Sequence, residues 1–414
     1  MSVSRRGFFT TLSTPLQTVP TATLIAARGR EAMASEATEA HLMEPRFVPP
    51  PAAGEIRLKS NENPLGPGKV AVEAIRTAFN QAGRYPFNAR KSSSGLKEML
   101  AKEFHAKPEN IVLGAGSSEI LRIAVRAFTS PQRPLVTADP SFENPVKTAE
   151  LIGSPVKAVS VDREFRLDLD EMARASNGAG LVFLCNPNNP TATVHSFRAV
   201  AEFVSRLQRD SPQTAILIDE AYHDYVSAPR YRTAMRLAIN RPGVFVSRTF
   251  SKAYGMAGLR VGYAVGQPET VRKLAGYKLN YDVNVLGIAA AMAAFNDRGH
   301  IAREKDRNTG VRDFTVGFFE SVGLKATDGQ TNFIFVNIGR PASEFREACQ
   351  KYKVEVGRDF PPFEKTHTRI SLGTMNEMER AVKVFQKVLA ATTTHTSEPG
   401  RRKPVANAPS KSGL

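Results

Sequence analysis

Short apolar runs alternate with amphipathic segments through the middle of the chain, from about Ile111 onward. Runs of this length that are rich in Val, Ile and Leu are typical of strands buried on both faces. Their alternation with helical segments predicts an α/β fold, in which a parallel or mostly parallel sheet carries helices on both faces. The predicted strands are Leu135–Thr137, Val156–Val161, Leu181–Cys185, Ala215–Ile218, Val244–Ser247 and Val261–Val265.

Other helix and strand patterns flank this region on both sides. Apolar spacing predicts helices at Val70–Gln81 and Leu96–Phe104, and a long helix that follows Phe295 and ends near Ser321. We also predict strands at Ile56–Ser60, Asn332–Asn337, Val354–Val356 and Arg369–Leu372, and a helix at Asn376–Leu389. We therefore expect a large domain, residues 85–296, and a smaller α+β domain built from an N-terminal arm, residues 56–84, and from residues 297–390.

The two ends of the chain differ from this globular pattern. Residues 1–34 contain Ser4-Arg5-Arg6-Gly7-Phe8-Phe9 near their start, followed by a mildly apolar stretch, and end with Ala32-Met33-Ala34. This arrangement resembles a bacterial twin-arginine export signal and predicts a periplasmic protein, the alternative being a disordered extension on a cytoplasmic one. Residues 35–55 are predicted to be a linker, and residues 391–414 a disordered tail.

Composition excludes several classes of protein. No stretch approaches 18 uninterrupted apolar residues, so no membrane span is predicted. Two cysteines are too few for a disulfide framework, and no zinc-ligand spacing is present. The formal net charge of +16 favours anionic ligands. We expect small molecules and not nucleic acid, because basic and aromatic residues are not interleaved along the strands.

The run from Thr249 to Gly262 carries the most specific chemistry in the chain. Ser251 and Lys252 follow an apolar strand, and Arg260 comes eight residues after the lysine. A lysine amine forms a Schiff base with an aldehyde, and a serine hydroxyl with an arginine suits a phosphate. An aldehyde that carries a phosphate is pyridoxal 5′-phosphate. A solvated lysine in a surface loop is the alternative for this run taken alone.

Polar clusters follow three successive predicted strands. Asn189 lies in the cluster after Cys185, Asp219 and Tyr222 lie in the next, and Lys252 lies in the third. Ligands collect at the carboxyl ends of strands in open α/β sheets. A carboxylate at Asp219 would keep a pyridine ring nitrogen protonated, and Asn189 and Tyr222 would donate to its phenolic oxygen. Lys252 would carry a proton as general base and acid.

A glycine turn supplies a candidate phosphate site. Gly114-Ala115-Gly116-Ser117 opens an amphipathic helical segment, and helix N-terminal amides bind phosphate. Ser251 and Arg260 would complete the site, although a simple serine N-cap is the alternative for the turn by itself. Phe142 follows the next predicted strand and could stack on the pyridine ring; the alternative is a core phenylalanine.

Two late arginines are candidates for binding substrate. Arg369 stands within a predicted strand of alternating apolar residues, where a planar guanidinium could hold an α-carboxylate at two points. Arg358 lies near the same region and is a candidate for a distal anion of the substrate, or a surface charge. The turn that begins at Asn61 is the third candidate for substrate contact.

These motifs together resemble the fold type I aminotransferases that use pyridoxal phosphate, and most of all the histidinol-phosphate aminotransferase group. The matching runs are Asn61-Glu-Asn-Pro64, Arg84-Tyr85-Pro86, Gly114-Ala-Gly116, Pro187-Asn-Asn-Pro-Thr191, Asp219-Glu-Ala-Tyr222, Ser251–Gly262 and Arg369-Ile-Ser-Leu-Gly-Thr374.

The resemblance implies a seven-stranded large domain, a smaller α+β domain and transfer of an amino group between an amino acid, or a histidinol phosphate-like amine, and a 2-oxo acid such as 2-oxoglutarate. It implies that Lys252 carries the cofactor, that Asp219, Tyr222 and Asn189 hold its ring, and that Arg369 and Arg358 bind the substrate. It also implies a homodimer, in which Tyr85 reaches the cofactor phosphate of the neighbouring subunit.

The chain departs from the family pattern at three places: Ala192 replaces a glycine, Phe142 a tyrosine, and Pro145 a second tyrosine. Because Pro145 falls on the substrate side, the sequence does not determine whether histidinol phosphate is the donor. Two other functions remain as alternatives, a decarboxylase of the threonine-phosphate type and a non-catalytic binding or regulatory protein on the same fold.

Overall fold

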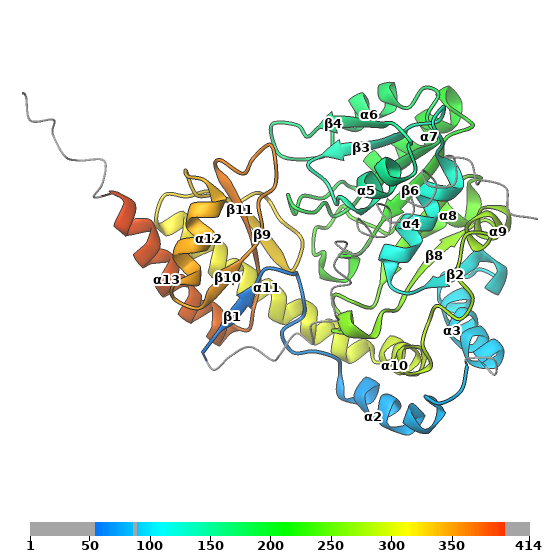
Figure 1. Cartoon of the computed structure of the whole chain (residues 1–414), viewed down its shortest axis with the longest axis horizontal. Helices are drawn as coiled ribbons and strands as arrows, with labels where there is room; N and C mark the ends of the chain where they lie inside the picture. Colours follow the sequence, from blue (N-terminus) through cyan, green and yellow to red (C-terminus); the bar gives the residue numbers. More distant parts are fainter. Residues whose placement is uncertain (1–53, 86–88, 394–414) are drawn as a thin grey trace, which may run out of the picture. The chain divides into compact units, whose positions relative to one another are not determined.

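A seven-stranded sheet is the centre of the fold in a computed structural model, which describes residues 54–85 and 89–393 (Figure 1). The strand order is β2-β8-β7-β6-β5-β3-β4, and β8 runs antiparallel to both of its neighbours whereas the other pairs are parallel. This confirms the predicted mostly parallel sheet. The strands are β2 (Ile111–Gly114), β3 (Leu135–Asp139), β4 (Val156–Ser160), β5 (Leu181–Cys185), β6 (Ala215–Asp219), β7 (Val244–Thr249) and β8 (Gly262–Gly266).

Helices cover both faces of this sheet because successive strand residues point to opposite sides. Val182 and Leu184 of β5 belong to one apolar cluster, whereas Leu181 and Phe183 belong to another. On the first side lie α3 (Ala89–Phe104), α6 (Leu169–Ala175), α7 (Phe197–Asp210), α8 (Met235–Asn240) and α10 (Val285–Asn296). On the second side lie α4 (Ser117–Phe128), α5 (Asn144–Leu151) and α9 (Pro268–Ala275).

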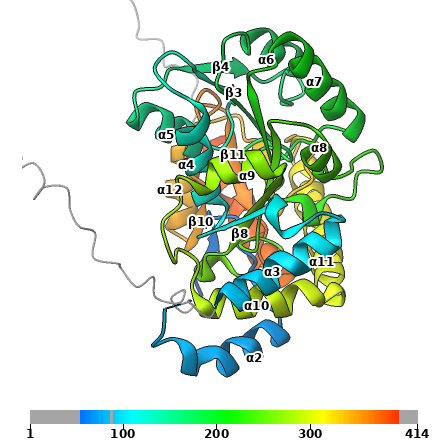
Figure 2. The same ribbon diagram turned by 90° about the vertical axis from the view of Figure 1, so that its right-hand side faces the viewer.

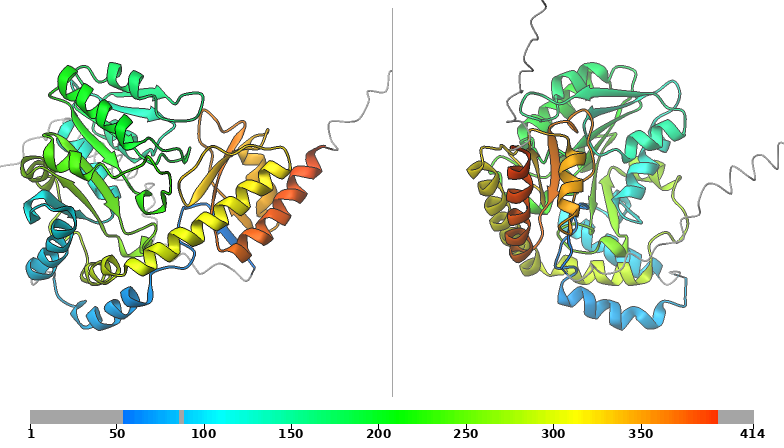
Figure 3. Two further views of the ribbon diagram at one scale, coloured as in Figure 1. Left: turned by 180° about the vertical axis from the view of Figure 1, so that it is seen from behind. Right: turned by 60° about the vertical axis from the view of Figure 1, so that its left-hand side comes forward.

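Two small sheets form a separate core. In one, β1 (Ile56–Leu58) pairs in parallel with β10 (Val354–Val356); in the other, β9 (Phe333–Asn337) pairs antiparallel with β11 (His367–Ser371). Their apolar side chains pack with Phe319, Phe345 and Phe385 from the three helices of this part. These helices are α11 (Arg298–Ser321), α12 (Ala342–Gln350) and α13 (Met375–Thr393), and Figure 3 shows α11 and α13 lying side by side.

The N-terminal arm connects the two cores. After β1 the chain forms α2 (Lys69–Ala78) and a single 3-10 turn, Phe79–Gln81. Helix α2 lies along α10 on the side away from the sheet (Figures 1 and 2). The turn between β1 and α2 carries Asn61 and passes the carboxyl ends of the central strands, which brings this early segment to the candidate site.

The predicted elements agree with the observed ones to within a few residues, except that α3 begins earlier than predicted. The tail prediction was wrong at its start, because α13 continues through Thr393 instead of ending before residue 391. The export signal, nearly all of the linker and residues 394–414 lie outside the described residues, and the division into two domains stays a prediction. Within residues 54–85 and 89–393, no helix is long and apolar enough to cross a membrane.

Candidate active site

A cavity of about 550 Å³ lies at the carboxyl ends of β5, β6 and β7. This is the edge at which the sequence places its three polar clusters, and the structure brings them together. The predicted site residues that line it are Asn61, Ser117, Phe142, Asn189, Asp219, Tyr222, Ser251, Lys252, Arg260, Arg358 and Arg369.

Asp219 ends β6 as a buried carboxylate, with only 2% of its surface exposed. Burial raises its pKa to about 6, although a hydrogen bond from Ser247 Oγ to Asp219 Oδ1, at 2.6 Å, acts in the opposite direction. Sequence reasoning missed Ser247. Its signal is the strand register, because Ser247 of β7 lies directly opposite Asp219 of β6.

Lys252 lies in the loop after β7, between the central sheet and the N-terminal arm. Its Nζ donates to the carbonyl oxygens of Asn61, at 3.0 Å, and Ser60, at 3.3 Å. Burial, followed by the nearby positive charge of Arg369, lowers the pKa of Lys252 to about 8. A lysine with a lowered pKa is a better nucleophile and base near neutral pH.

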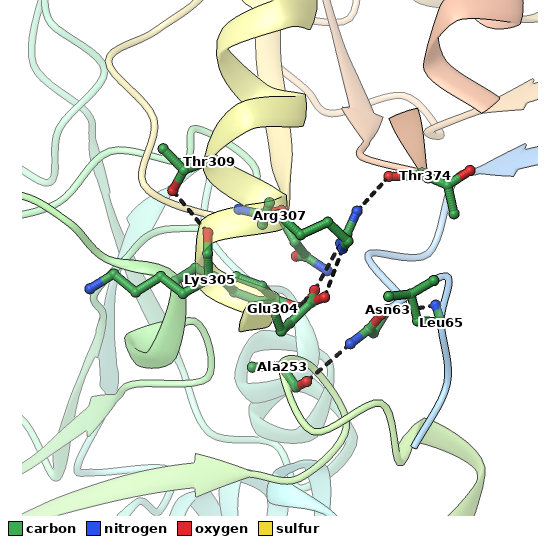
Figure 4. A network of polar contacts seen from close by, with 12 residues as sticks. Asn63, Leu65, Ala253, Glu304, Lys305, Arg307, Thr309 and Thr374 are labelled. Carbon is green, nitrogen blue, oxygen red and sulfur yellow. Dashed lines mark hydrogen bonds and ion pairs between the residues drawn. The ribbon is translucent and has the colours of Figure 1, made fainter. Parts of the chain in front are cut away.

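Asn63 holds the backbone next to Lys252 (Figure 4). Its Nδ2 donates to the Ala253 carbonyl at 3.0 Å, while its Oδ1 accepts from the Leu65 N–H at 3.0 Å. The two segments approach closely because Gly255 has no side chain: a Cβ there would lie 1.9 Å from the Gly66 carbonyl oxygen. Asn63 belongs to the Asn61-Glu-Asn-Pro64 motif, but no role was predicted for it from the sequence.

An ion pair between Glu304 and Arg307 links helix α11 to the loop after β11 (Figure 4). Glu304 of α11 binds Arg307 at 2.7 and 2.8 Å and accepts from the Tyr225 hydroxyl at 3.3 Å. Arg307 also donates to the Gly373 carbonyl at 2.8 Å. Helix α11 thereby fixes the loop that follows β11, the strand that carries Arg369.

The candidate phosphate site is formed by the start of α4 and by Arg260. Arg260 Nη1 donates to Ser251 Oγ at 3.3 Å, and Nη2 donates to the Ala115 carbonyl at 3.2 Å. Gly116 has a φ of 78°, and a Cβ there would lie 2.3 Å from Arg260 Nη2, so the turn requires glycine. Ala115 and Gly116 touch Arg260 without lining the cavity, whereas Ser117 at the helix start lines it.

Asn61 and Tyr222 meet on the other side of Lys252. Asn61 Nδ2 donates to the Tyr222 hydroxyl at 3.1 Å, and Ser371 Oγ donates to Asn61 Oδ1 at 2.8 Å. Burial raises the pKa of Tyr222, so it remains a neutral phenol at neutral pH. Lys252 Nζ lies 5.7 Å from the centre of the Tyr222 ring.

Arg369 extends from β11 into the cavity from the smaller core. Its Nη1 donates to Asn189 Oδ1 at 2.8 Å and its Nη2 to the Lys59 carbonyl at 2.6 Å. Its buried Nε has no hydrogen-bond partner among the described residues. Burial lowers the pKa of Arg369 to about 10, which leaves it cationic at neutral pH.

Three residues singled out in the sequence lie elsewhere. Tyr85 is 73% exposed, packs against Tyr281 with the ring centres 5.6 Å apart, and is not part of the cavity lining. Pro145 is buried in the first turn of α5 and also does not line the cavity. Ala192 has a φ of 63°, a left-handed conformation that favours glycine, which is the residue that the family resemblance implies at this turn.

Comparison with known proteins identifies the family. The model for aminotransferase class I and II matches residues 53–385. This chain belongs to the family of class I and II aminotransferases. The histidinol-phosphate aminotransferase of Moorella thermoacetica is 38% identical over 339 residues, which cover 81% of this chain and 86% of that protein.

Solved structures support the same assignment. A putative histidinol-phosphate aminotransferase from Erwinia carotovora atroseptica has a TM-score of 0.78 and 30% identity, over 84% of this chain and 99% of that one. The Sinorhizobium meliloti histidinol-phosphate aminotransferase, solved in complex with pyridoxal 5′-phosphate, has a TM-score of 0.76 and 26% identity. The match covers 85% of this chain and 98% of that one. The predicted fold and the predicted class of enzyme, a pyridoxal phosphate-dependent aminotransferase, are confirmed.

The residues of this aminotransferase fit the cofactor. A buried carboxylate at Asp219 suits a protonated ring nitrogen, and the start of α4 with Ser251 and Arg260 suits a phosphate. Lys252 lies in the same cavity with its amine accessible to an aldehyde. The missing side chain at Gly116 leaves room for the Arg260 guanidinium beside the helix start.

The raised pKa of Asp219 predicts a pH-dependent stability for the enzyme stripped of its cofactor. Since the folded pKa of about 6 exceeds the unfolded value of 3.8, the folded state binds more protons in this interval, and stability falls as pH rises through about 6. Between about pH 4 and pH 8, Asp219→Asn should therefore gain about 3 kcal/mol in unfolding free energy relative to wild type. Urea unfolding of both proteins at several pH values measures this difference, and parallel pH profiles would contradict it.

Proposed function

We propose that this aminotransferase transfers an amino group from a donor with an anionic distal end to a 2-oxo acid such as 2-oxoglutarate. The donor is an amino acid or a phosphorylated amine resembling histidinol phosphate. The observation that carries this proposal is that Arg369 and Arg358 line the cavity of Lys252. Both guanidinium groups lie on the Phe360 ring, at 4.8 and 4.2 Å from its centre, so one ligand can reach both.

When bound, pyridoxal phosphate supplies an aldehyde for the amino group and a ring that withdraws electrons from the substrate Cα. Asp219 holds the proton on the ring nitrogen, and Ser247 orients the Asp219 carboxylate. Lys252 is the residue that would take the proton from the substrate Cα and deliver it to the carbon of the cofactor aldehyde group. Its pKa of about 8 allows it to act in both directions near neutral pH.

Binding and orientation come from the surrounding residues. Arg369 holds the α-carboxylate of an amino-acid donor or of the 2-oxo acid, and Asn189 keeps the guanidinium in place. Tyr222 and Asn189 would donate hydrogen bonds to the phenolic oxygen of the cofactor, and Phe142 would pack against its ring. Asn61 orients the Tyr222 hydroxyl through the 3.1 Å hydrogen bond between them.

We also propose that the enzyme is a homodimer in which Tyr85 completes the phosphate site of the neighbouring subunit. The exposed apolar side chains of Tyr85, Leu279 and Tyr281 support this arrangement. Mixing an inactive Lys252→Ala protein with an inactive Tyr85→Ala protein under subunit exchange should restore activity, because hybrid dimers contain one intact site. A mixture that stays inactive while the subunits exchange argues against shared sites.

The location of the enzyme remains a proposal that rests on the sequence alone. Periplasmic export by the twin-arginine route would suit an enzyme that takes up its cofactor before transport. The motif at Arg5-Arg6 supports it, and a cytoplasmic location is the alternative.

The test of the proposed reaction is a screen of amine donors with 2-oxoglutarate as acceptor. We expect glutamate to form with donors that carry a phosphate or a second carboxylate, and the visible absorbance of the bound cofactor to change only with true substrates. Release of carbon dioxide without glutamate would replace the proposal by the decarboxylase. Equal rates with donors that have neutral and anionic distal ends would contradict the role of Arg358.

A further inference from the structure

Arg358 forms an ion pair with Glu143 across the cavity. Glu143 precedes α5 on the side of the central sheet, whereas Arg358 follows β10 in the smaller core. The distance from Arg358 Nη2 to Glu143 Oε2 is 2.6 Å, and both residues line the cavity that contains Lys252. The proposed role of Arg358 is to bind a distal anion of the substrate, and its guanidinium already contacts an anion of the protein itself.

Other contacts of Arg358 fix its orientation. Nη1 donates to the Asp359 carbonyl at 2.9 Å, and the guanidinium lies over the Phe360 ring at 4.2 Å from the centre. The Phe360 ring covers one face of the guanidinium, and the Asp359 carbonyl accepts from Nη1. Nη2 therefore points to Glu143 at the cavity wall. A bound anion and the Glu143 carboxylate therefore require the same donor.

The charges around this position show why a competing carboxylate has an effect. Arg346 also lines the cavity and forms its own ion pair with Asp359 at 2.5 Å. The charged lining residues are basic at Lys59, Lys252, Arg260, Arg346, Arg358 and Arg369, and acidic at Glu62, Glu143 and Asp219. Among these acids, Glu143 is the one that forms an ion pair with a basic group of the lining, and its other carboxylate oxygen lies 3.5 Å from Lys147 Nζ. Glu143 therefore supplies Arg358 with a charge that a ligand would otherwise bring.

We propose that Glu143 determines substrate specificity by competing with the distal anion of the substrate for Arg358. This inference rests on the proposed function, which assigns the distal anion to Arg358. A ligand whose distal end is anionic has to displace Glu143, whereas a ligand whose distal end is neutral leaves the ion pair intact. A phosphate monoester carries a charge of about −1.5 to −2 at neutral pH and three acceptor oxygens, so it displaces a carboxylate more readily than a second carboxylate does.

The test compares two unreactive ligands on the holoenzyme, glutarate with two carboxylates and butyrate with one. Replacing Glu143 with glutamine keeps the shape of the side chain and removes its charge. Because exposed ion pairs contribute modestly, we expect Glu143→Gln to bind glutarate about two- to fivefold more tightly than wild type and to bind butyrate unchanged. Calorimetric titration measures both dissociation constants.

Glu171→Gln is the matched control, because Glu171 forms an exposed ion pair with Arg174 on α6 and does not line the cavity. It should leave both dissociation constants as in wild type. In an Arg358→Ala background, Glu143→Gln should no longer change glutarate binding, because the guanidinium for which Glu143 and glutarate compete is absent. Unchanged or weaker glutarate binding by Glu143→Gln in the wild-type background would overturn the inference.

The outcome separates this inference from the proposed function. Neither probe is a substrate, so the binding comparison does not depend on which amine the enzyme uses. Tighter glutarate binding by Glu143→Gln together with failure of every anionic donor to react would support the competition and reject the proposed substrates. In an enzyme that does react with both donor types, Glu143→Gln should lower the preference for phosphorylated over dicarboxylic donors in kcat/KM.

Discussion

Replacing Lys252 with alanine should lower the turnover number for transamination by at least about 1000-fold, because general acid–base catalysis alone contributes about 10²- to 10⁴-fold. The variant also loses the amine that we propose to bind the aldehyde of the cofactor. Lys252 lines the cavity together with Asp219 and Arg369, and its amine donates to the carbonyls of Ser60 and Asn61. Steady-state rates with a true donor and 2-oxoglutarate measure the loss.

A second measurement for Lys252 does not depend on turnover. Borohydride reduction followed by peptide mass spectrometry should find the cofactor attached to Lys252 in wild type and to no peptide in the variant. Lys387→Ala is the control, because Lys387 lies on α13 with its amine 4.5 Å from the centre of the Tyr352 ring, away from the cavity lining. Attachment of the cofactor at another lysine of the wild-type protein would disprove the assignment.

Replacing Arg369 with alanine should lower kcat/KM by about 30- to 4000-fold, since truncating one partner of a buried charge pair costs about 2–5 kcal/mol. The loss should affect the 2-oxo acid acceptor and amino-acid donors alike, because both present an α-carboxylate at the same position. Affinity for the cofactor should change much less, since α4, Ser251 and Arg260 form the proposed phosphate site. Steady-state kinetics and cofactor titration test the two parts separately.

Arg369→Ala also removes the donor to Asn189 and to the Lys59 carbonyl, so some stability should be lost. Arg312→Ala separates stability from binding, because Arg312 is a buried arginine of α11 that does not line the cavity. It should lower the melting temperature without raising KM. Equal rises of KM in both variants would mean that Arg369 acts only through the fold.

The central sheet could be predicted from the sequence because its strands are short apolar runs that end in polar residues. Buried parallel strands require such runs, and the polar residue at each end marks the edge where ligands bind. Lys252, Asp219 and Asn189 were found for this reason, each at the end of its own strand. Their roles stay proposals, although the structure brings all three into one cavity.

Ser247, Asn63 and Glu143 were missed for a physical reason. Each acts through a partner that is distant along the chain: Asp219 for Ser247, Ala253 for Asn63, and Arg358 for Glu143. A serine within a strand, an asparagine in a turn and a glutamate before a helix are ordinary local features. Their significance depends on register and on the approach of two cores, neither of which has a local signal.

The sequence by itself determined the class of fold and the cofactor, and it singled out the lysine that we propose to carry the chemistry, because these follow from periodicity and from residues that stand close together along the chain. The tertiary structure alone decided which side chains share a hydrogen bond, which charges lie together and how far each pKa moves. The raised pKa of Asp219 depends on its burial in the folded protein. The ion pair between Arg358 and Glu143 joins residues more than 200 positions apart, on opposite sides of the cavity. Such contacts form only when the folded backbone brings the segments together.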